Sequence, residues 1–349
     1  LFKSLLALSL LIIFGKSALS MDTIAKQAIM TEFDTGQIIL EKNPDELMKP
    51  ASMAKLMTIY IVFEKIKNKS ISLDDKFIVS EKAWKKRGSR TFLEPGQTVS
   101  VEDLLRGVIV QSGNDAAIVL AEGISGTEDI FSDLMNSVAR ELKMDNTIFK
   151  NSTGWPDPQQ NTSSRDLSIL TLNLIKKFPD LYKMFAEISF TYNGIKQGNR
   201  NPILYNNLVF GADGLKTGHT QESGYGLVGS AKQDGRRIIF VLSGLNTLED
   251  RAQEAETIVN WAFRQFKLEK FATGGSEVAK AKVWNGKSRY VSLVLENDLN
   301  IMQPVLSSNE PSFAVEYVGP IKAPIKKGDK IAELVIISPD LPETRHSLF

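Results

Sequence analysis

A serine and a lysine three residues apart, Ser52 and Lys55, are the side chains of this sequence best suited to covalent chemistry. Apolar residues follow at helical spacing, which predicts a helix from Met53 to about Lys67 with Ser52 at its N-terminus. Residues three apart on a helix share a face, so the Lys55 amine can reach the Ser52 hydroxyl. A lysine whose pKa is lowered by burial or by a second cation can take the serine proton and create a nucleophile.

The pair alone is also open to a purely structural interpretation, in which Ser52 caps the helix and Lys55 is solvated. At ordinary residue frequencies, roughly one Ser-x-x-Lys match is expected by chance in a chain of this size. Other residues must therefore decide between a reactive pair and a helix cap.

Composition excludes several other kinds of site. The 349 residues include 42 basic and 41 acidic side chains, a net charge of +1, which gives no electrostatic case for nucleic acid as a partner. There is no cysteine, and His219 and His346 are the only histidines. A histidine-rich zinc site cannot be built, and a serine enzyme of this composition would use a base other than histidine. Ser-Lys chemistry needs no metal and no organic cofactor.

The N-terminal residues 1–20 are typical of a secretory signal peptide. Lys3 precedes an apolar run over 5–14, and Ser17-Ala18-Leu19-Ser20 follows, with small residues at the positions that a signal peptidase favours. We expect cleavage near Ser20 and a mature chain in the periplasm or cell envelope. A retained membrane anchor is the alternative, but the run is short for a bilayer span.

The order of elements predicts an α/β (α+β) domain over 21–267. Two short strands meet at a hairpin signature over 34–36, and a mostly helical stretch covers about 70–180. Strand patterns return at 224–231 and 237–243, and a helical stripe over 251–266 closes the unit. These patterns favour an antiparallel sheet with flanking helices and a helical subdomain.

The character of the sequence changes at the C-terminal end. Short alternating runs over 280–284, 290–295, 313–318 and 331–337 are separated by Asn-, Gly- and Pro-bearing turns. Such spacing without a helical stripe predicts a small all-β sandwich domain over 268–349. Nothing in this stretch has the residues of a catalytic site.

Two further motifs follow Ser52-x-x-Lys55 in the chain. They are Ser112-Gly113-Asn114, in a polar loop between two predicted helices, and Lys216-Thr217-Gly218, just before the returning strands. This ordered trio resembles the motif set of penicillin-binding proteins and serine β-lactamases. Longer stretches are similar to the low-molecular-mass D-alanyl-D-alanine carboxypeptidases, and the similarity runs from about 24 to 340; they are 50–58, 111–116, 192–195, 199–201, 213–220 and 327–334.

The resemblance implies a reaction. Peptidoglycan stem peptides ending in D-Ala-D-Ala would acylate Ser52 and lose the terminal D-Ala, and penicillins would block the same serine covalently. Lys55 would take the serine proton, and Ser112 would relay a proton to the leaving amine. Asn114 would orient Lys55, while the charge of Lys216 would keep Lys55 neutral.

The resemblance also implies substrate-binding groups. The backbone N–H groups of Ser52 and His219 would form the oxyanion hole. Thr217 and its neighbour Gly218 would lie along the substrate, with Thr217 donating to the terminal carboxylate. Arg200 and Arg251 are candidate cations for binding that carboxylate or for positioning Lys216. For each arginine, a structural salt bridge is an equally open interpretation.

Two departures from the family pattern are visible. Many relatives carry a His-Gly pair where this chain has Thr153-Gly154, so a role for that histidine in deacylation does not transfer. Relatives also commonly end in an amphipathic helix that lies on the inner membrane. No such helix fits before Phe349, so we expect either a soluble periplasmic protein or a peripheral membrane protein whose anchor is missing from this sequence.

Three other functions compete with the carboxypeptidase. A class A β-lactamase would need a Glu-x-x-Leu-Asn-like loop, which does not occur between Asn114 and Lys216, and would not carry the β-rich C-terminal domain. A D,D-endopeptidase acting on cross-links would cleave a bond of the same stereochemistry. A non-catalytic peptidoglycan-binding module is disfavoured because all the motif side chains are intact.

Overall fold

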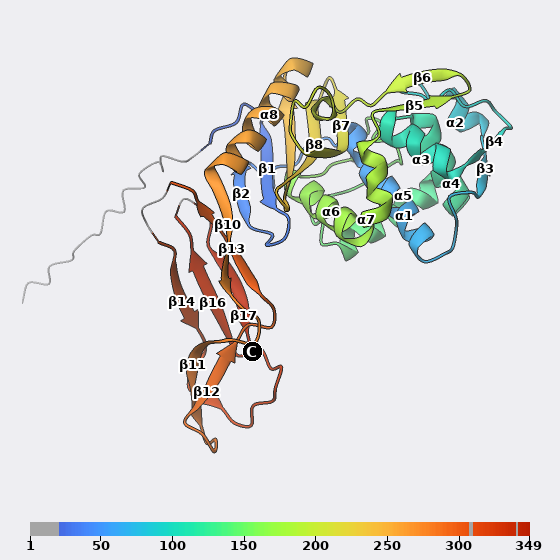
Figure 1. The fold of residues 1–349 in the computed structure, drawn as a ribbon. Helices are drawn as coiled ribbons and strands as arrows, with labels where there is room; N and C mark the ends of the chain where they lie inside the picture. Colours follow the sequence, from blue (N-terminus) through green and yellow to red (C-terminus); the bar gives the residue numbers. More distant parts are fainter. Residues whose placement is uncertain (1–20, 307–309, 340) are drawn as a thin grey trace, which may run out of the picture.

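The computed structural model describes residues 21–306, 310–339 and 341–349, which form two domains (Figure 1). The predicted signal peptide over 1–20 lies outside the described residues. Within the described ranges, no helix combines the length and apolar character needed to cross a bilayer.

The first domain is built on a five-stranded antiparallel sheet in the order β2-β1-β9-β8-β7. The predicted hairpin over 34–36 joins the first two strands. Strand β7 lies at one edge of the sheet. The bounds are β1 Gln27–Glu32, β2 Ile38–Lys42, β7 Ala212–Thr220, β8 Gly224–Gln233 and β9 Arg236–Leu245.

Alternate residues of the central strands enter two different cores, as the two-residue period of a strand requires. In β1, Ile29 packs with the helical side, whereas Ala28 and Met30 pack on the opposite face. Helix α8 (Leu248–Gln265) covers that opposite face and begins at a capping box of Thr247 and Asp250. The predicted helix over 251–266 is thus confirmed, with its start a few residues earlier.

Helices cover the other face of the sheet. Helix α1 (Lys55–Lys67) is buried at nine consecutive positions, Lys55 to Phe63, so it is the central helix of this layer and not a surface helix. The other helical segments are η1 Ala51–Ala54, α2 Glu81–Lys85, α3 Val101–Val110, α4 Asn114–Ser125, α5 Glu128–Glu141, α6 Ser164–Lys177, α7 Pro179–Tyr182, η2 Lys183–Ala186 and η3 Pro202–Leu204. Two small hairpins complete the domain, β3 Lys76–Ile78 with β4 Thr98–Ser100 and β5 Ser189–Tyr192 with β6 Ile195–Gly198.

The second domain contains strands alone in its described part, which confirms the predicted all-β domain, and it extends from the end of the molecule opposite the helical layer (Figure 1). Its sheets are β10-β13, β12-β11-β15 and β14-β16-β17. Leu293, Leu334 and Ile336 lie in a core of its own. The bounds are β10 Phe266–Ala272, β11 Glu277–Trp284, β12 Tyr290–Val294, β13 Leu299–Pro304, β14 Ser312–Glu316, β15 Ile321–Lys322, β16 Ala332–Ile337 and β17 Thr344–Leu348.

The two domains join without a linker, because β10 begins directly after α8 ends at Gln265. The Met302 backbone N–H donates to Gln37 Oε1 across the junction at 3.1 Å. Met302 also packs in the core beneath α8. The predicted division after residue 267 stays a prediction.

Candidate active site

Ser52 lies in a tight turn, η1, that leads directly into α1. Ala51, just before it, has a φ of +45°, a left-handed conformation that costs a non-glycine residue free energy and is often found at functional sites. Two glycines allow backbone to close on this turn. A Cβ on Gly218 of β7 would lie 3.1 Å from the Pro50 carbonyl oxygen, and a Cβ on Gly154 would lie 1.7 Å from the Ala51 carbonyl oxygen.

The Lys55 amine is fully buried and has three polar contacts. Nζ lies 3.0 Å from Ser52 Oγ, 2.8 Å from Asn114 Oδ1 and 2.6 Å from the Thr153 carbonyl oxygen. The Ser52 side chain makes no capping hydrogen bond at the start of the helix. The interpretation with a capping serine and a solvated lysine is therefore wrong.

Burial lowers the pKa of Lys55 from its usual 10.5 to about 7. This value includes smaller effects of nearby charges: Arg200 and Lys86 lower the pKa, and the carboxylates of Asp115 and Glu128 raise it. Arg200 is exposed to solvent, which screens its charge, so burial is the main cause. The charge of Lys216 also interacts with that of Lys55, and the expected role of Lys216 in keeping Lys55 neutral stays a prediction.

Asn114 is held so that its oxygen faces Lys55. Its Nδ2 donates to the Arg87 carbonyl at 2.8 Å, and its backbone N–H donates to the Ser89 carbonyl at 2.7 Å. Ser112, two residues earlier, is buried with a φ of +60°, and its Oγ has no hydrogen-bond partner within the described residues. A buried hydroxyl without a partner is costly, and it is available to a bound molecule.

Lys216 and Thr217 are buried on the edge strand β7. Lys216 Nζ donates to the Thr217 carbonyl at 3.1 Å, and burial first, then the charges of Lys55, Arg200 and Arg251, hold the Lys216 pKa well below its usual value. No acidic side chain of the described ranges pairs with Lys216. This strand therefore presents a buried amine without a counter-ion.

The two candidate arginines differ in exposure. Arg251 is buried, its guanidinium lies 5.7 Å from the centre of the Tyr225 ring, and burial lowers its pKa to about 10. Arg200 is exposed. In the described part of the chain neither forms an ion pair, so no salt bridge accounts for either. His219 is also exposed, and its ring stacks on Tyr225 with the centroids 3.9 Å apart.

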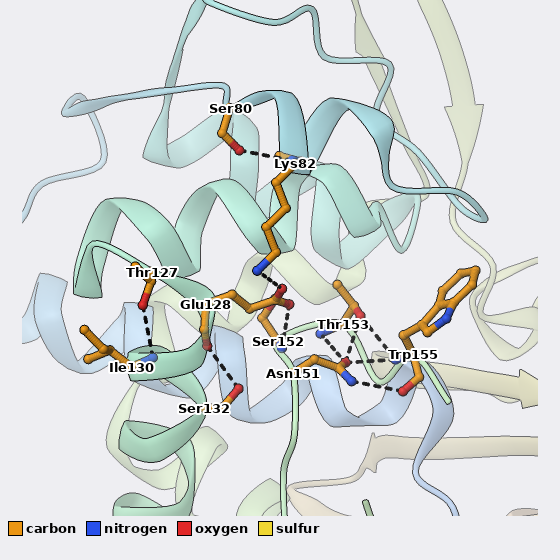
Figure 2. A network of polar contacts seen from close by, with 11 residues as sticks. Ser80, Lys82, Thr127, Glu128, Ile130, Ser132, Asn151, Ser152, Thr153 and Trp155 are labelled. Carbon is orange, nitrogen blue, oxygen red and sulfur yellow. Dashed lines mark hydrogen bonds and ion pairs between the residues drawn. The ribbon is translucent and has the colours of Figure 1, made fainter. Parts of the chain in front are cut away.

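The sequence did not reveal the backbone groups of this site. The carbonyl of Thr153 contacts Lys55, and the carbonyl of Arg87 orients Asn114. The Thr153 hydroxyl instead donates to Asn151 Oδ1 at 2.9 Å, within its own loop (Figure 2). No side-chain pattern predicts which carbonyl will face an amine; Gly154 was the one visible signal that this loop approaches closely.

Comparison with known proteins places this geometry in a family. A family model described as D-alanyl-D-alanine carboxypeptidase matches residues 15–247, and one described as penicillin-binding protein 5, C-terminal domain, matches 266–340. The chain belongs to the D-alanyl-D-alanine carboxypeptidases. Within this family, the D-alanyl-D-alanine carboxypeptidase DacA of Haemophilus influenzae is 36% identical over 316 residues, 89% of this chain and 80% of the relative.

Solved structures of relatives agree with this assignment. Penicillin binding protein 5 from Haemophilus influenzae superposes with a TM-score of 0.85 at 34% identity, over 94% of this chain and 96% of that one. Penicillin-binding protein D2 from Listeria monocytogenes, solved in an ampicillin-bound form, is 29% identical with a TM-score of 0.64 and covers 70% of this chain and 99% of its own. The predicted fold class and family are both confirmed.

Proposed function

We propose that this carboxypeptidase removes the terminal D-Ala from peptidoglycan stem peptides through an acyl-enzyme on Ser52, with Lys55 as the base. The observation that carries the proposal is the set of contacts around the Lys55 amine. It combines a pKa of about 7 with a serine hydroxyl at 3.0 Å. A general base works best when its pKa lies near the operating pH.

The contacts also orient the lone pair of the amine. The Thr153 carbonyl can only accept, and Asn114 Oδ1 must accept because the amide nitrogen is bound to Arg87. A neutral amine has two N–H groups and one lone pair. When both N–H groups donate to these oxygens, the lone pair faces the Ser52 hydroxyl, which can donate.

The reaction follows from this arrangement. Lys55 takes the hydroxyl proton as Ser52 Oγ bonds to the carbonyl carbon of the penultimate D-Ala. The C–N bond then breaks, and the leaving D-Ala amine receives a proton through the Ser112 hydroxyl, whose Oγ has no partner in the described part of the chain. Water attacks the ester, and proton return to Oγ releases the shortened peptide and restores Ser52.

The substrate's terminal carboxylate is matched by uncompensated positive charge. Lys216 and Arg251 are buried without acidic partners in the described ranges, and Arg200 adds an exposed charge. A carboxylate bound here supplies the missing counter-ion, and Thr217 offers a hydroxyl beside it. Because β7 is an edge strand, a peptide can also lie along its backbone, with Gly218 allowing β7 to approach the Ser52 turn.

The oxyanion of the tetrahedral intermediate needs fixed donors. The backbone N–H groups of Ser52 and His219 are assigned this role, the first in the turn before α1 and the second on β7. The outward ring of His219 means that its contribution comes from the main chain. Each donor in such a hole contributes on the order of 3 kcal/mol.

The proposed location is the periplasm or cell envelope, where the substrate lies and where a signal over 1–20 would direct the chain. The proposed ligands besides stem peptides are β-lactams, supported by the ampicillin-bound relative from Listeria monocytogenes. Peripheral association with the inner membrane is the alternative location, which an amphipathic helix after Phe349 would provide. No group of three or more potential metal-ligating side chains converges within the described residues.

A second activity, endopeptidase action on cross-links, has one supporting observation. A D-alanyl-D-alanine endopeptidase from Pseudomonas aeruginosa is 30% identical over 207 residues, 58% of this chain. The carboxypeptidase relatives match through the all-β domain as well, so carboxypeptidase action is the main proposal.

The test uses purified protein, labelled penicillin and whole muropeptides. We expect free D-Ala from pentapeptides and a long-lived penicillin adduct, both absent in Ser52→Ala. Ser168→Ala is the matched control, since Ser168 is a buried serine of α6 that contacts Thr31 of β1 and has no contact with Lys55. Rapid release of penicilloate would indicate a β-lactamase, and loss of dimeric muropeptides alone an endopeptidase. D-Ala release by Ser52→Ala at the parental rate would contradict the assigned nucleophile.

A further inference from the structure

The loop that contacts Lys55 is anchored by a buried carboxylate, Glu128, which none of the motifs includes. Glu128 opens α5 next to its N-cap Thr127, a position where the helix dipole favours negative charge. Its Oε1 accepts the Ser152 backbone N–H at 3.1 Å and the Ser152 hydroxyl at 2.7 Å. Its Oε2 pairs with Lys82 at 2.9 Å (Figure 2).

Ser152 passes this restraint to α1 and to the reactive amine. Its carbonyl accepts the Thr58 hydroxyl of α1 at 2.7 Å, and the next carbonyl, that of Thr153, accepts from Lys55 at 2.6 Å. Asn151 closes the loop from within by accepting from the N–H groups of Thr153 and Trp155 (Figure 2). The loop is thus held to Glu128 by two hydrogen bonds. Two of its carbonyls, those of Ser152 and Thr153, hold it to α1.

We propose that Glu128 is a positioning residue for Lys55: through Ser152 it holds the Thr153 carbonyl on one N–H of the amine, so that the lone pair faces Ser52. The inference rests on the proposed function, because it requires Lys55 as the base. Without a fixed carbonyl the amine can rotate, and its lone pair is no longer directed at the hydroxyl. Lys82 is half exposed and compensates the carboxylate, which limits the stabilisation of a protonated Lys55.

A matched pair of variants separates positioning from stability. Asp166 is a second buried carboxylate that holds a loop, through the Asn146 backbone N–H at 2.9 Å and the Thr147 hydroxyl at 2.6 Å, but neither residue contacts Lys55. Glu128→Ala and Asp166→Ala each lose two hydrogen bonds to a loop, and Glu128→Ala also loses the ion pair with Lys82, so we expect both to lower the melting temperature. We expect Glu128→Ala to reduce the plateau rate of penicillin acylation by roughly 10–100-fold, and Asp166→Ala to change it by less than about threefold.

The conservative variant Glu128→Gln supplies a readout that loop stability does not affect. The amide oxygen can still accept from Ser152, so the plateau rate should recover to within about threefold of the parent. Loss of the negative charge should move the inflection of the rate toward lower pH, because the charge raises the Lys55 pKa. The other charged groups that act on this amine are unchanged in the variant; they are Lys86, Asp115, Arg200 and Lys216.

The outcomes are distinct. Equal losses in Glu128→Ala and Asp166→Ala, or a parental acylation rate in folded Glu128→Ala, would overturn the positioning role. If Glu128→Ala does not fold, Ser152→Ala replaces it, since it removes one of the two bonds to Glu128 and should lower the rate by roughly 3–10-fold; a parental rate there also overturns the role. Failure of the proposed function would show instead in the parent, as an absent Ser52 adduct.

Discussion

Strand β7 carries two charged side chains three residues apart, Asp213 and Lys216, with opposite surroundings. Asp213 accepts two hydrogen bonds from Arg237, at 2.8 and 2.6 Å, and one from the Tyr182 hydroxyl at 2.7 Å. Lys216 is more deeply buried, yet its amine finds one backbone carbonyl and no carboxylate in the described part of the chain. Near its start the strand thus has a satisfied ion pair, and at its middle it has a buried amine without an acidic partner in the described ranges.

The difference between Asp213 and Lys216 separates a structural ion pair from a candidate functional group. A buried charge without a counter-ion is costly, and proteins retain such groups mainly at functional sites. Lys55, Lys216 and Arg251 are all buried basic side chains without an acidic partner in the described ranges, and each has a lowered pKa. The Asp213 cluster, by contrast, joins β7 to Arg237 of β9 and to Tyr182 of α7, which is a structural role.

The largest expected effect comes from Lys55→Arg, which keeps the charge but removes the base. A guanidinium does not release its proton near neutral pH. Acylation by labelled penicillin should fall by at least about 1,000-fold. The rate is measured under single-turnover conditions on folded protein. An adduct formed at the parental rate would exclude Lys55 as the base.

Lys216→Met tests the buried amine at the middle of β7. The variant keeps the length of the side chain but loses the amine that we propose binds the substrate carboxylate. We expect kcat/KM for a D-Ala-D-Ala peptide to fall roughly 100-fold, a charged hydrogen bond's contribution of about 3 kcal/mol. The free energy of unfolding in urea should stay the same or rise by about 1 kcal/mol, because a costly buried amine is gone. A clear loss of stability with unchanged kcat/KM would show that Lys216 has a structural role and does not bind the substrate.

Asp213→Ala tests the ion-paired carboxylate of β7, with the smallest expected effect on catalysis. Arg237 and the Tyr182 hydroxyl lose their acceptor, and we expect the free energy of unfolding to fall by about 2 kcal/mol, since the pair is partly solvated. Acylation by the folded variant should stay within about threefold of the parent. The urea midpoint and the acylation rate are measured on the same preparation, and a large loss of rate at native stability would place Asp213 in the site.

Side-chain chemistry was predictable from the sequence to a large extent. Helical spacing placed Lys55 beside Ser52, and the alternation of short strands indicated both the sheet and the all-β domain. Such features depend on local periodicity and on residue type, which are visible in the chain.

What could not be predicted depends on long-range backbone contacts. Loop 151–155 meets Lys55 from almost 100 residues away, through a carbonyl that every residue type possesses. The contact of Glu128 with Ser152 is likewise invisible in the sequence, where Glu128 is one acidic residue among many. Sequence order also does not show that Arg200 acts on Lys55 or that burial is the main cause of its lowered pKa.

The most direct test of the neutral-lysine account is the pH dependence of acylation in the unmodified protein. Lys55 is reactive only when unprotonated, and its pKa is lowered to about 7. The rate with labelled penicillin should therefore rise about tenfold per pH unit below that value and level off above it. A rate that is flat between pH 5 and 8, or that still rises beyond pH 9, would contradict the account.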